Sequence, residues 1–410
     1  FAPMDLQNLK KIPADRILSY ILMAAFFSMP LGTSWNGIFG GLAALVWIAS
    51  GMAWQNRNLY LSAAWCRPVL FLILLPWVCL IWSVDAADMG ISFAEKSYYW
   101  LYGLALASLT YRRFSPDHLI KALLAGLTVN FCWAAVQMAG LFPYGITGPT
   151  GFGRGYSTLA TYLIVGMLMA SYYFSREKGE KTRFIYPVLT AVFFFHLVVL
   201  QGRTGYVTFV VASPLIVKNF IKKSMTPLLI PISMLLLGIM LLSPTVRDRV
   251  ALSVQQVQYH LNADADKAWG REYSRHQDRF YMWYGAYELI RDHSFLGVGT
   301  GGFQKALKLR RNPNDPPIAH PHNDFLHMTV SYGLLGVLGF IWFYWEMIKN
   351  GWHNRSRASG YFVLSTALVM LVSGLFNSHM LDSGTLFMLS LGAGMQQTLM
   401  HSGVIEKRVV

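Results

Sequence analysis

The chain has 410 residues, of which 54% are hydrophobic and 13% charged, and its formal net charge is +14. An average soluble domain carries about 25% charged residues, so this composition excludes an ordinary water-soluble enzyme, and it also excludes a disordered chain. In a soluble protein the positive charge would suggest nucleic acid. In an apolar chain the positions of the basic residues indicate the membrane topology, because Lys and Arg gather on the cytoplasmic side. We therefore expect a membrane protein with no nucleic-acid partner.

Twelve apolar segments are predicted to form transmembrane helices, since about 20 mostly apolar residues cross the hydrocarbon core. The shortest of them, 97–111, begins directly after Lys96. The adjacent pair 184–201 and 204–221 has about twice the length that one crossing needs. The expected fold class is an all-α polytopic membrane protein. In chain order the segments are 16–33, 37–54, 68–84, 97–111, 118–140, 156–175, 184–201, 204–221, 226–244, 324–348, 359–378 and 383–400.

The basic residues indicate on which side of the membrane each connecting segment lies. With the amino terminus inside, the predicted cytoplasmic segments carry twenty Lys and Arg, whereas the short outer loops carry only Lys96, Arg154 and Arg203. This bias predicts that both termini are cytoplasmic, provided that 184–221 forms two spans with Arg203 at the outer turn. We therefore divide the chain into 1–244 with nine spans, an outer segment 245–323, and 324–410 with three spans and a cytoplasmic tail.

The segment 245–323 is the one long part of the sequence outside the predicted spans, and it would face the periplasm of a Gram-negative cell. Helices are predicted over 246–260 and 271–293, with a break at 262–270. The second helix is amphipathic and places Arg275 and Arg279 four residues apart, hence on one face. Chemistry at the outer face would be expected in this segment.

A His-Pro-His-Asn string, containing His320, His322 and Asn323, precedes the tenth span. Histidine is the side chain best suited to proton transfer near neutral pH, and this string is not a typical interfacial anchor. From the residues alone two interpretations stay open. The string is either a catalytic loop or a polar loop that caps the next helix through Asn323 or Asp324.

Three isolated arginines are predicted on the outer face: Arg154 in a glycine-rich loop, Arg203 at a short turn, and Arg279 on the amphipathic helix. Ionisable groups at membrane depth mark functional sites by default, and guanidinium binds phosphate oxygens in a bidentate manner. Two or three converging arginines would bind a diphosphate without a metal ion. Snorkelling to lipid headgroups is the alternative for each one alone, and it fits Arg154 better than Arg203.

Other strings are less informative. Gly297–Gly302 looks like a phosphate cradle, but no strand precedes it, so we interpret it as a tight turn that ends a helix. Asp264 and Asp266 resemble the DxD pair of metal-dependent glycosyltransferases and are interpreted as a solvated turn. His379 and Asp382, in the last outer loop, could border a site. The three cysteines show no disulfide or metal-ligand spacing, and we expect neither a metal nor a cofactor.

Three ordered stretches resemble the O-antigen ligase family, within the wider superfamily of bacterial O-antigen ligases and polymerases. They are Gln201–Gly205; Arg279–Trp283 running into His293–Phe303; and His320–Leu326 followed by Tyr332–Gly336. Together with one long outer loop between late spans, they cover residues 200–340. The first 150 residues resemble the family only in being membrane spans.

The resemblance implies a multi-pass glycosyltransferase of the bacterial inner membrane that acts without a metal ion at a periplasmic site. The donor would be a polysaccharide on undecaprenyl diphosphate, and the acceptor would be lipid A–core in lipopolysaccharide assembly. Carried over to this chain, His322 would be the catalytic histidine, and Arg203 and Arg279 would bind the diphosphate. Direct attack, with His322 as general base, would invert the anomeric centre. Further predicted substrate-binding residues are Arg154, Arg275, His320 and Asn323.

Three alternatives remain. An O-antigen polymerase would share the membrane plan and the donor, and its acceptor would be a second lipid-linked glycan. A transporter of a lipid-linked glycan would also use arginines near the membrane face, but it predicts ionisable residues within several spans, whereas here they are few and the polar set gathers on one side. A non-catalytic scaffold leaves the histidines and arginines unexplained.

Overall fold

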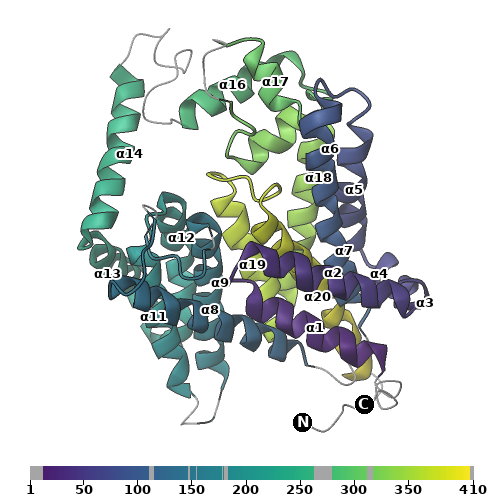
Figure 1. The fold of residues 1–410 in the computed structure, drawn as a ribbon. Helices are drawn as coiled ribbons and strands as arrows, with labels where there is room; N and C mark the ends of the chain where they lie inside the picture. Colours follow the sequence, from purple (N-terminus) through teal and green to yellow (C-terminus); the bar gives the residue numbers. More distant parts are fainter. Residues whose placement is uncertain are drawn as a thin grey trace.

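The structure is a computed structural model that describes residues 13–109, 115–145, 148–153, 155–177, 179, 183–262, 279–311 and 317–406, with side chains described up to residue 397. All regular elements in these residues are helical (Figure 1). Each of the twelve predicted apolar segments contains a helix. These helices are α1 (Ala14–Ser28), α2 (Thr33–Ala49), α5 (Cys66–Val78), α7 (Trp100–Ala107), α8 (Pro116–Met138), α9 (Tyr156–Arg176), α11 (Ile185–Val199), α12 (Arg203–Phe220), α13 (Leu229–Leu241), α18 (Asp324–His353), α19 (Ala358–Ser373) and α20 (Ser383–Glu406).

Short helices connect some of these elements. The first half of the chain adds α3 (Met52–Gln55), α4 (Arg57–Leu61), the π-helix η2 (Ala86–Gly90), α6 (Ile91–Glu95) and the 3₁₀-helix η3 (Lys96–Tyr99). The 3₁₀-helix η5 (Lys223–Leu228) leads into α13. The predicted segment 184–221 forms two helices, because residues 200–202 between α11 and α12 are not helical.

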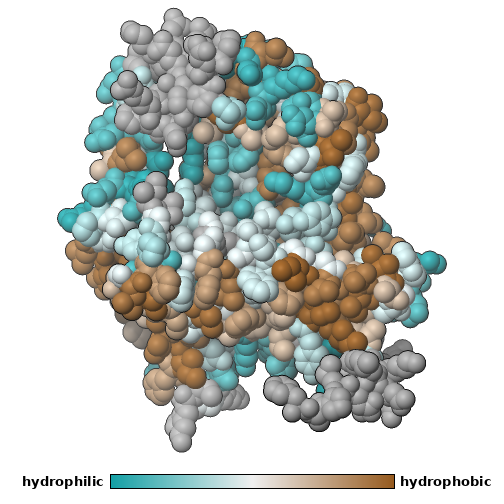
Figure 2. All heavy atoms as spheres, viewed as in Figure 1, coloured by the Kyte–Doolittle hydropathy of each residue, from teal (hydrophilic) through white to brown (hydrophobic). Residues whose placement is uncertain are grey.

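Length and composition support a helical membrane protein. Four stretches are long and apolar enough to cross a bilayer: α8, α9, Lys223–Leu241 and α18. The apolar helices α2, α5, α11 and α19 are shorter than 18 residues. In Figure 2, hydrophobic side chains cover much of the lower half of the visible face, including α1 and α2, whereas hydrophilic ones gather higher up. The count of twelve crossings stays a prediction.

The core is organised around α9, whose residues 158–173 are all buried. Helices α11, α12 and α19 pack along it. A second tight contact joins α7 and α20, where the Ser390 hydroxyl accepts a hydrogen bond of 2.8 Å from the Gly103 amide. A Cβ on Gly394 would lie 2.0 Å from the Gly103 carbonyl oxygen, so this contact requires glycine.

The described helices of the predicted outer segment lie towards one end of the bundle (Figure 1). Helix α14 (Pro244–Asn262) spans the stretch 246–260, and α16 (Arg279–Asp292) lies within the stretch 271–293. The outer location of this segment stays a prediction. Helix α17 (Phe303–Lys308) follows a turn. Asp264, Asp266 and Arg275 lie outside the described residues.

The glycine-rich stretch after α16 is a turn, as predicted, and it packs against a kink in α18. Gly333, with φ 60° and ψ −146°, interrupts the helical geometry of α18. The carbonyls of Val330 and Ser331, freed by the kink, accept hydrogen bonds from the amides of Val298 (2.8 Å) and Gly299 (3.0 Å). Gly299 has φ 82°, and a Cβ there would lie 2.3 Å from Ser83 Cα. The glycines therefore serve close backbone packing.

Candidate functional site

Side chains from six separate segments meet where the helices of the outer segment approach the bundle. They come from the first residues of α9 and α12, from α14, from the start of α16, from the loop 317–323 and from the loop between α19 and α20. All of these positions belong to parts of the chain predicted to face outward. The meeting of these segments at one end of the bundle therefore agrees with the predicted alternation of the spans across the membrane.

Arg203 is the first residue of α12, and its guanidinium group contacts α14. Its Nη1 atom donates hydrogen bonds to Ser253 Oγ (3.2 Å) and Gln256 Oε1 (2.5 Å). The neighbouring Gln201 accepts a hydrogen bond from Arg249 of the same helix. These polar contacts fix α14 against the turn between α11 and α12, and Arg249 adds a cation that the sequence reasoning missed.

Arg279 begins α16 and donates a hydrogen bond of 3.3 Å to Thr204 Oγ1, next to Arg203. Burial, followed by repulsion from Arg203, lowers the pKa of Arg279 to about 10, against an opposing effect of Tyr156. Within the described part of the chain, no carboxylate forms an ion pair with Arg279. Because buried charges are normally paired, an anion bound beside Arg279 would be stabilised by this charge.

The predicted pair Arg203 and Arg279 is thus brought together. Arg154 and Arg275 lie outside the described residues, so their part in the site stays a prediction.

His322 adopts a left-handed backbone conformation, with φ 50°, and it is the one non-glycine residue with positive φ in the described ranges. Such strained residues cluster at functional sites. Its backbone amide lies 3.4 Å from His320 Nδ1, which accepts its hydrogen, and the two imidazole rings are 4.3 Å apart between centroids. The turn therefore fixes the direction of the His322 side chain.

The surroundings of His322 favour its neutral form. Burial, followed by the charge of Arg279, lowers its pKa, while a side-chain hydrogen bond with Asn377 acts in the opposite direction. The Asn377 amide nitrogen donates to Ser157 Oγ (2.9 Å), which leaves its amide oxygen to accept from the imidazole. A neutral imidazole held by an acceptor can take up a proton at its other nitrogen.

His320 lies beside His322 and is also held neutral. Burial, followed by repulsion from His322, His327 and Lys96, lowers the pKa of His320 to about 3. Neutrality suits its role as acceptor of the His322 amide hydrogen. Its predicted contact with substrate stays a prediction.

Asn323 caps α18, so the capping interpretation of the string is confirmed for this residue. Its Oδ1 atom accepts a hydrogen bond from the Leu326 amide (3.0 Å), and its Nδ2 atom donates to the Leu375 carbonyl (2.9 Å). The second bond connects the histidine loop to the loop between α19 and α20. Substrate binding by Asn323 stays a prediction.

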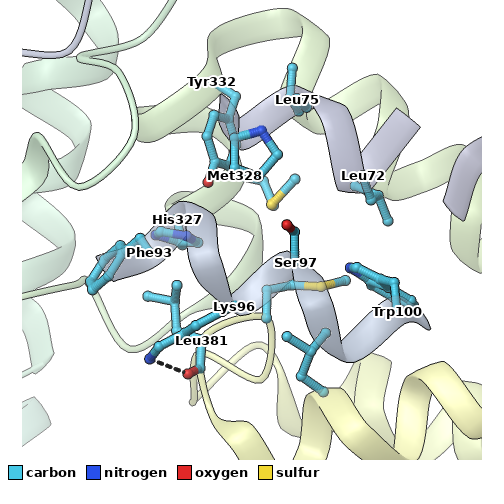
Figure 3. A pocket seen from close by; sticks show the side chains of 13 residues that line it. Leu72, Leu75, Phe93, Lys96, Ser97, Trp100, His327, Met328, Tyr332 and Leu381 are labelled. Atoms are coloured by element: carbon cyan, nitrogen blue, oxygen red, sulfur yellow. Dashed lines mark hydrogen bonds between the residues drawn. The ribbon is translucent and has the colours of Figure 1, made fainter. Parts of the chain in front are cut away.

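A cavity of about 30 Å³ lies beside His327, lined also by Lys96, Phe93 and Tyr332 among others (Figure 3). The Lys96 ammonium donates a hydrogen bond of 2.6 Å to the Leu381 carbonyl and lies 5.4 Å from the centre of the Phe93 ring. The space can hold a water molecule but not a sugar. The cavity therefore adjoins the site without being the place where a glycan binds.

His379 and Asp382 bond within and beside their own loop. His379 Nε2 lies 2.5 Å from Ser373 Oγ. Asp382 Oδ1 accepts hydrogen bonds from the Thr158 hydroxyl (3.1 Å) and the Thr385 amide (2.8 Å). These contacts hold in place the loop that carries Asn377. His379 and Asp382 therefore contribute to the site by positioning this loop.

Residues 188–341 match a family model whose description is O-antigen ligase. This stretch is therefore similar to the O-antigen ligase family. A search of curated proteins gives no match. The matched stretch contains Arg203, Arg279, His320 and His322. Asn377 lies outside the matched range.

Proposed function

We propose that this protein is an O-antigen ligase that transfers a polysaccharide from undecaprenyl diphosphate to lipid A–core. One observation carries the proposal: Arg279 is desolvated, its charge interacts with both Arg203 and His322, and it has no carboxylate ion-pair partner among the described residues. A site with two cations and an adjacent neutral imidazole suits a diphosphate leaving group beside a hydroxyl nucleophile. The family match supports the same superfamily.

The arginines bind the diphosphate and offset its growing charge. Guanidinium groups form charge-assisted, often bidentate hydrogen bonds with phosphate oxygens. As the bond between the anomeric carbon and the diphosphate breaks, negative charge accumulates on the leaving oxygen. Preorganised cations stabilise that charge in a water-poor site, so we expect transfer without a metal ion.

His322 acts as general base. The acceptor hydroxyl oxygen forms a bond to the anomeric carbon, the bond to the diphosphate oxygen breaks, and the hydroxyl proton passes to the imidazole. The products are the glycosylated lipid A–core, undecaprenyl diphosphate and a protonated His322. One direct displacement inverts the anomeric configuration. The bound diphosphate would also offset the charge of Arg279, which favours proton uptake by His322.

The proposal includes the predicted topology. Both termini would be cytoplasmic, the protein would span the bacterial inner membrane, and the site would face the periplasm, with membrane lipid around the bundle. The basic residues of the short loops support this direction.

A transfer assay with purified components tests the function. It combines the protein in detergent with undecaprenyl-diphosphate glycan and lipid A–core in EDTA, and it follows the acceptor on a gel. A shift of the acceptor is the expected result. Lengthening of the donor glycan instead would identify a polymerase. Neither product, with competent substrates, would contradict enzymatic transfer and favour a transporter.

A further inference from the structure

Four aromatic side chains form a continuous row along the rim of the site. His260 of α14 lies 4.5 Å from Phe280 of α16, Phe280 lies 5.7 Å from Trp283, and Trp283 lies 6.2 Å from Phe376, measured between ring centroids. The row thus crosses from α14 over α16 to the loop between α19 and α20. We call these four residues the aromatic row.

The aromatic row borders both halves of the reaction site. Phe280 directly follows Arg279, which approaches Arg203. Phe376 directly precedes Asn377, which bonds to His322. A molecule that lies against the row therefore has its neighbouring groups within the region of the arginines and the histidine.

The row is not part of the packed interior. The opposite side of α16 supplies that interior, because Tyr281 and Leu289 are 2% and 1% exposed and pack with Val298 and Phe303. Phe280, Trp283 and Phe376 are all half-buried and belong to neither hydrophobic core. Helix α16 thus has one aromatic side that stabilises the fold and a second that lines the site.

The indole N–H of Trp283 is a second feature of the row. Its indole Nε1 is shielded from solvent and has no acceptor among the described residues. Buried indole N–H groups usually have a partner, and buried polar groups in general are satisfied. A ligand with acceptor oxygens at the edge of a flat apolar face would supply the missing partner.

We propose that the aromatic row is a binding site for pyranose rings of the glycan, and that Trp283 donates a hydrogen bond to a sugar oxygen. The proposal rests on the proposed function. A pyranose presents C–H groups on its faces and hydroxyls around its edge, which matches an aromatic surface with an indole donor. The sugar could belong to the donor or to the acceptor core, because both must reach His322.

Binding of three probes to the full-length protein in detergent tests the proposal. The probes are undecaprenyl diphosphate without sugar, undecaprenyl diphosphate carrying one N-acetylglucosamine, and free core oligosaccharide, each titrated by thermophoresis. The variants are Trp283→Leu, which removes the aromatic ring system, and Trp283→Phe, which removes the indole donor and leaves a smaller aromatic ring. Tyr287→Leu is the matched control, since Tyr287 lies one turn further along α16 and is 59% exposed.

We expect Trp283→Leu to raise the Kd of one saccharide probe about tenfold, as the loss of one stacked ring would, and that of the sugar-free lipid less than twofold. Trp283→Phe should lie between Trp283→Leu and wild type, and Tyr287→Leu should match wild type. The saccharide probe that weakens identifies the source of the sugar. Because Trp283→Phe keeps an aromatic ring at this position, it keeps the test valid if Trp283→Leu does not fold.

Two results would overturn the proposal: equal weakening of all three probes, or no weakening of either saccharide probe. Failure of the proposed function has a different signature. In that case the wild type would not bind the sugar-free lipid diphosphate, while the core oligosaccharide would still report on the aromatic row directly.

Discussion

The site has two walls that are built in different ways. The cationic wall consists of Arg203, Arg249 and Arg279, whose long side chains extend from helices towards uncharged acceptors such as Gln256 and Thr204. The histidine wall is a loop, fixed by the left-handed backbone of His322, by the hydrogen bond from the His322 amide to His320, and by the bond from Asn323 to the Leu375 carbonyl. A diphosphate-binding surface needs positive charge that the incoming anion can offset. A general base, in contrast, needs a side chain of fixed orientation in its neutral form.

The two walls are nevertheless coupled. Arg279 contributes to the lowered pKa of His322, after burial. An anion bound to Arg279 would weaken that repulsion and make the imidazole a better proton acceptor. Substitutions on each wall should therefore separate binding from chemistry, with a measurable cross-effect on pH dependence.

The largest effect is expected from the histidine wall. His322→Ala should lower kcat by about 10²- to 10⁴-fold, the usual contribution of a general base, while the Kd for the donor changes less than about twofold. Transfer kinetics and donor titration on the same preparation measure the two quantities. The control is His353→Ala, since His353 is exposed at the far end of α18. Near-native turnover of His322→Ala would refute the base assignment.

On the cationic wall, Arg279→Ala should weaken donor binding by about 10²-fold, because it removes a desolvated partner of the diphosphate. Arg279→Lys should restore part of that loss, since it keeps the charge without the bidentate geometry. Arg291→Ala, an exposed arginine of the same helix, is the matched control. The Kd for the donor, measured at fixed ionic strength for each variant, tests this prediction. A pure kcat effect with unchanged Kd would assign Arg279 to the chemical step instead.

The coupling between the walls predicts a pH profile. A base whose pKa is lowered stays neutral to lower pH, so the acid limb of kcat/KM should have its midpoint below the ordinary histidine value of 6.5. Asn377→Leu removes a hydrogen bond that favours the protonated form and should move the midpoint further down, with a loss of kcat of about tenfold. An upward shift of the midpoint would show that Asn377 does not accept from the imidazole.

The sequence predicted the helices better than their surroundings. Apolar length was sufficient to locate all twelve helices. It could not indicate that α9 is buried whereas α13 leaves Ile230, Met234 and Leu235 about two-thirds exposed, since in a bilayer both environments favour the same apolar residues. The kink at Gly333 was also missed, because it depends on backbone contacts with a turn more than thirty residues away.

The site was predictable where its residues were anomalous. Arg203, Arg279 and His322 stood out as cations and imidazole at a predicted membrane edge. Gln256 and Asn377 did not, because an amide side chain in a helix or a loop is ordinary. Their roles depend on tertiary approach: Gln256 meets Arg203 across 53 residues of chain.

The smallest effect is expected at the junction of the histidine wall with its helix. Asn323→Ala should destabilise the protein by about 1 kcal/mol through loss of the cap. Asn323→Asp should retain the cap, because its Oδ1 still accepts from the Leu326 amide, and lose only the bond to Leu375. Thermal unfolding in detergent, with the donor titrated in parallel, separates the two roles considered for this residue. Unchanged stability with weakened donor binding would favour a direct contact with substrate, whereas reduced stability with native binding would confine Asn323 to orienting the loop.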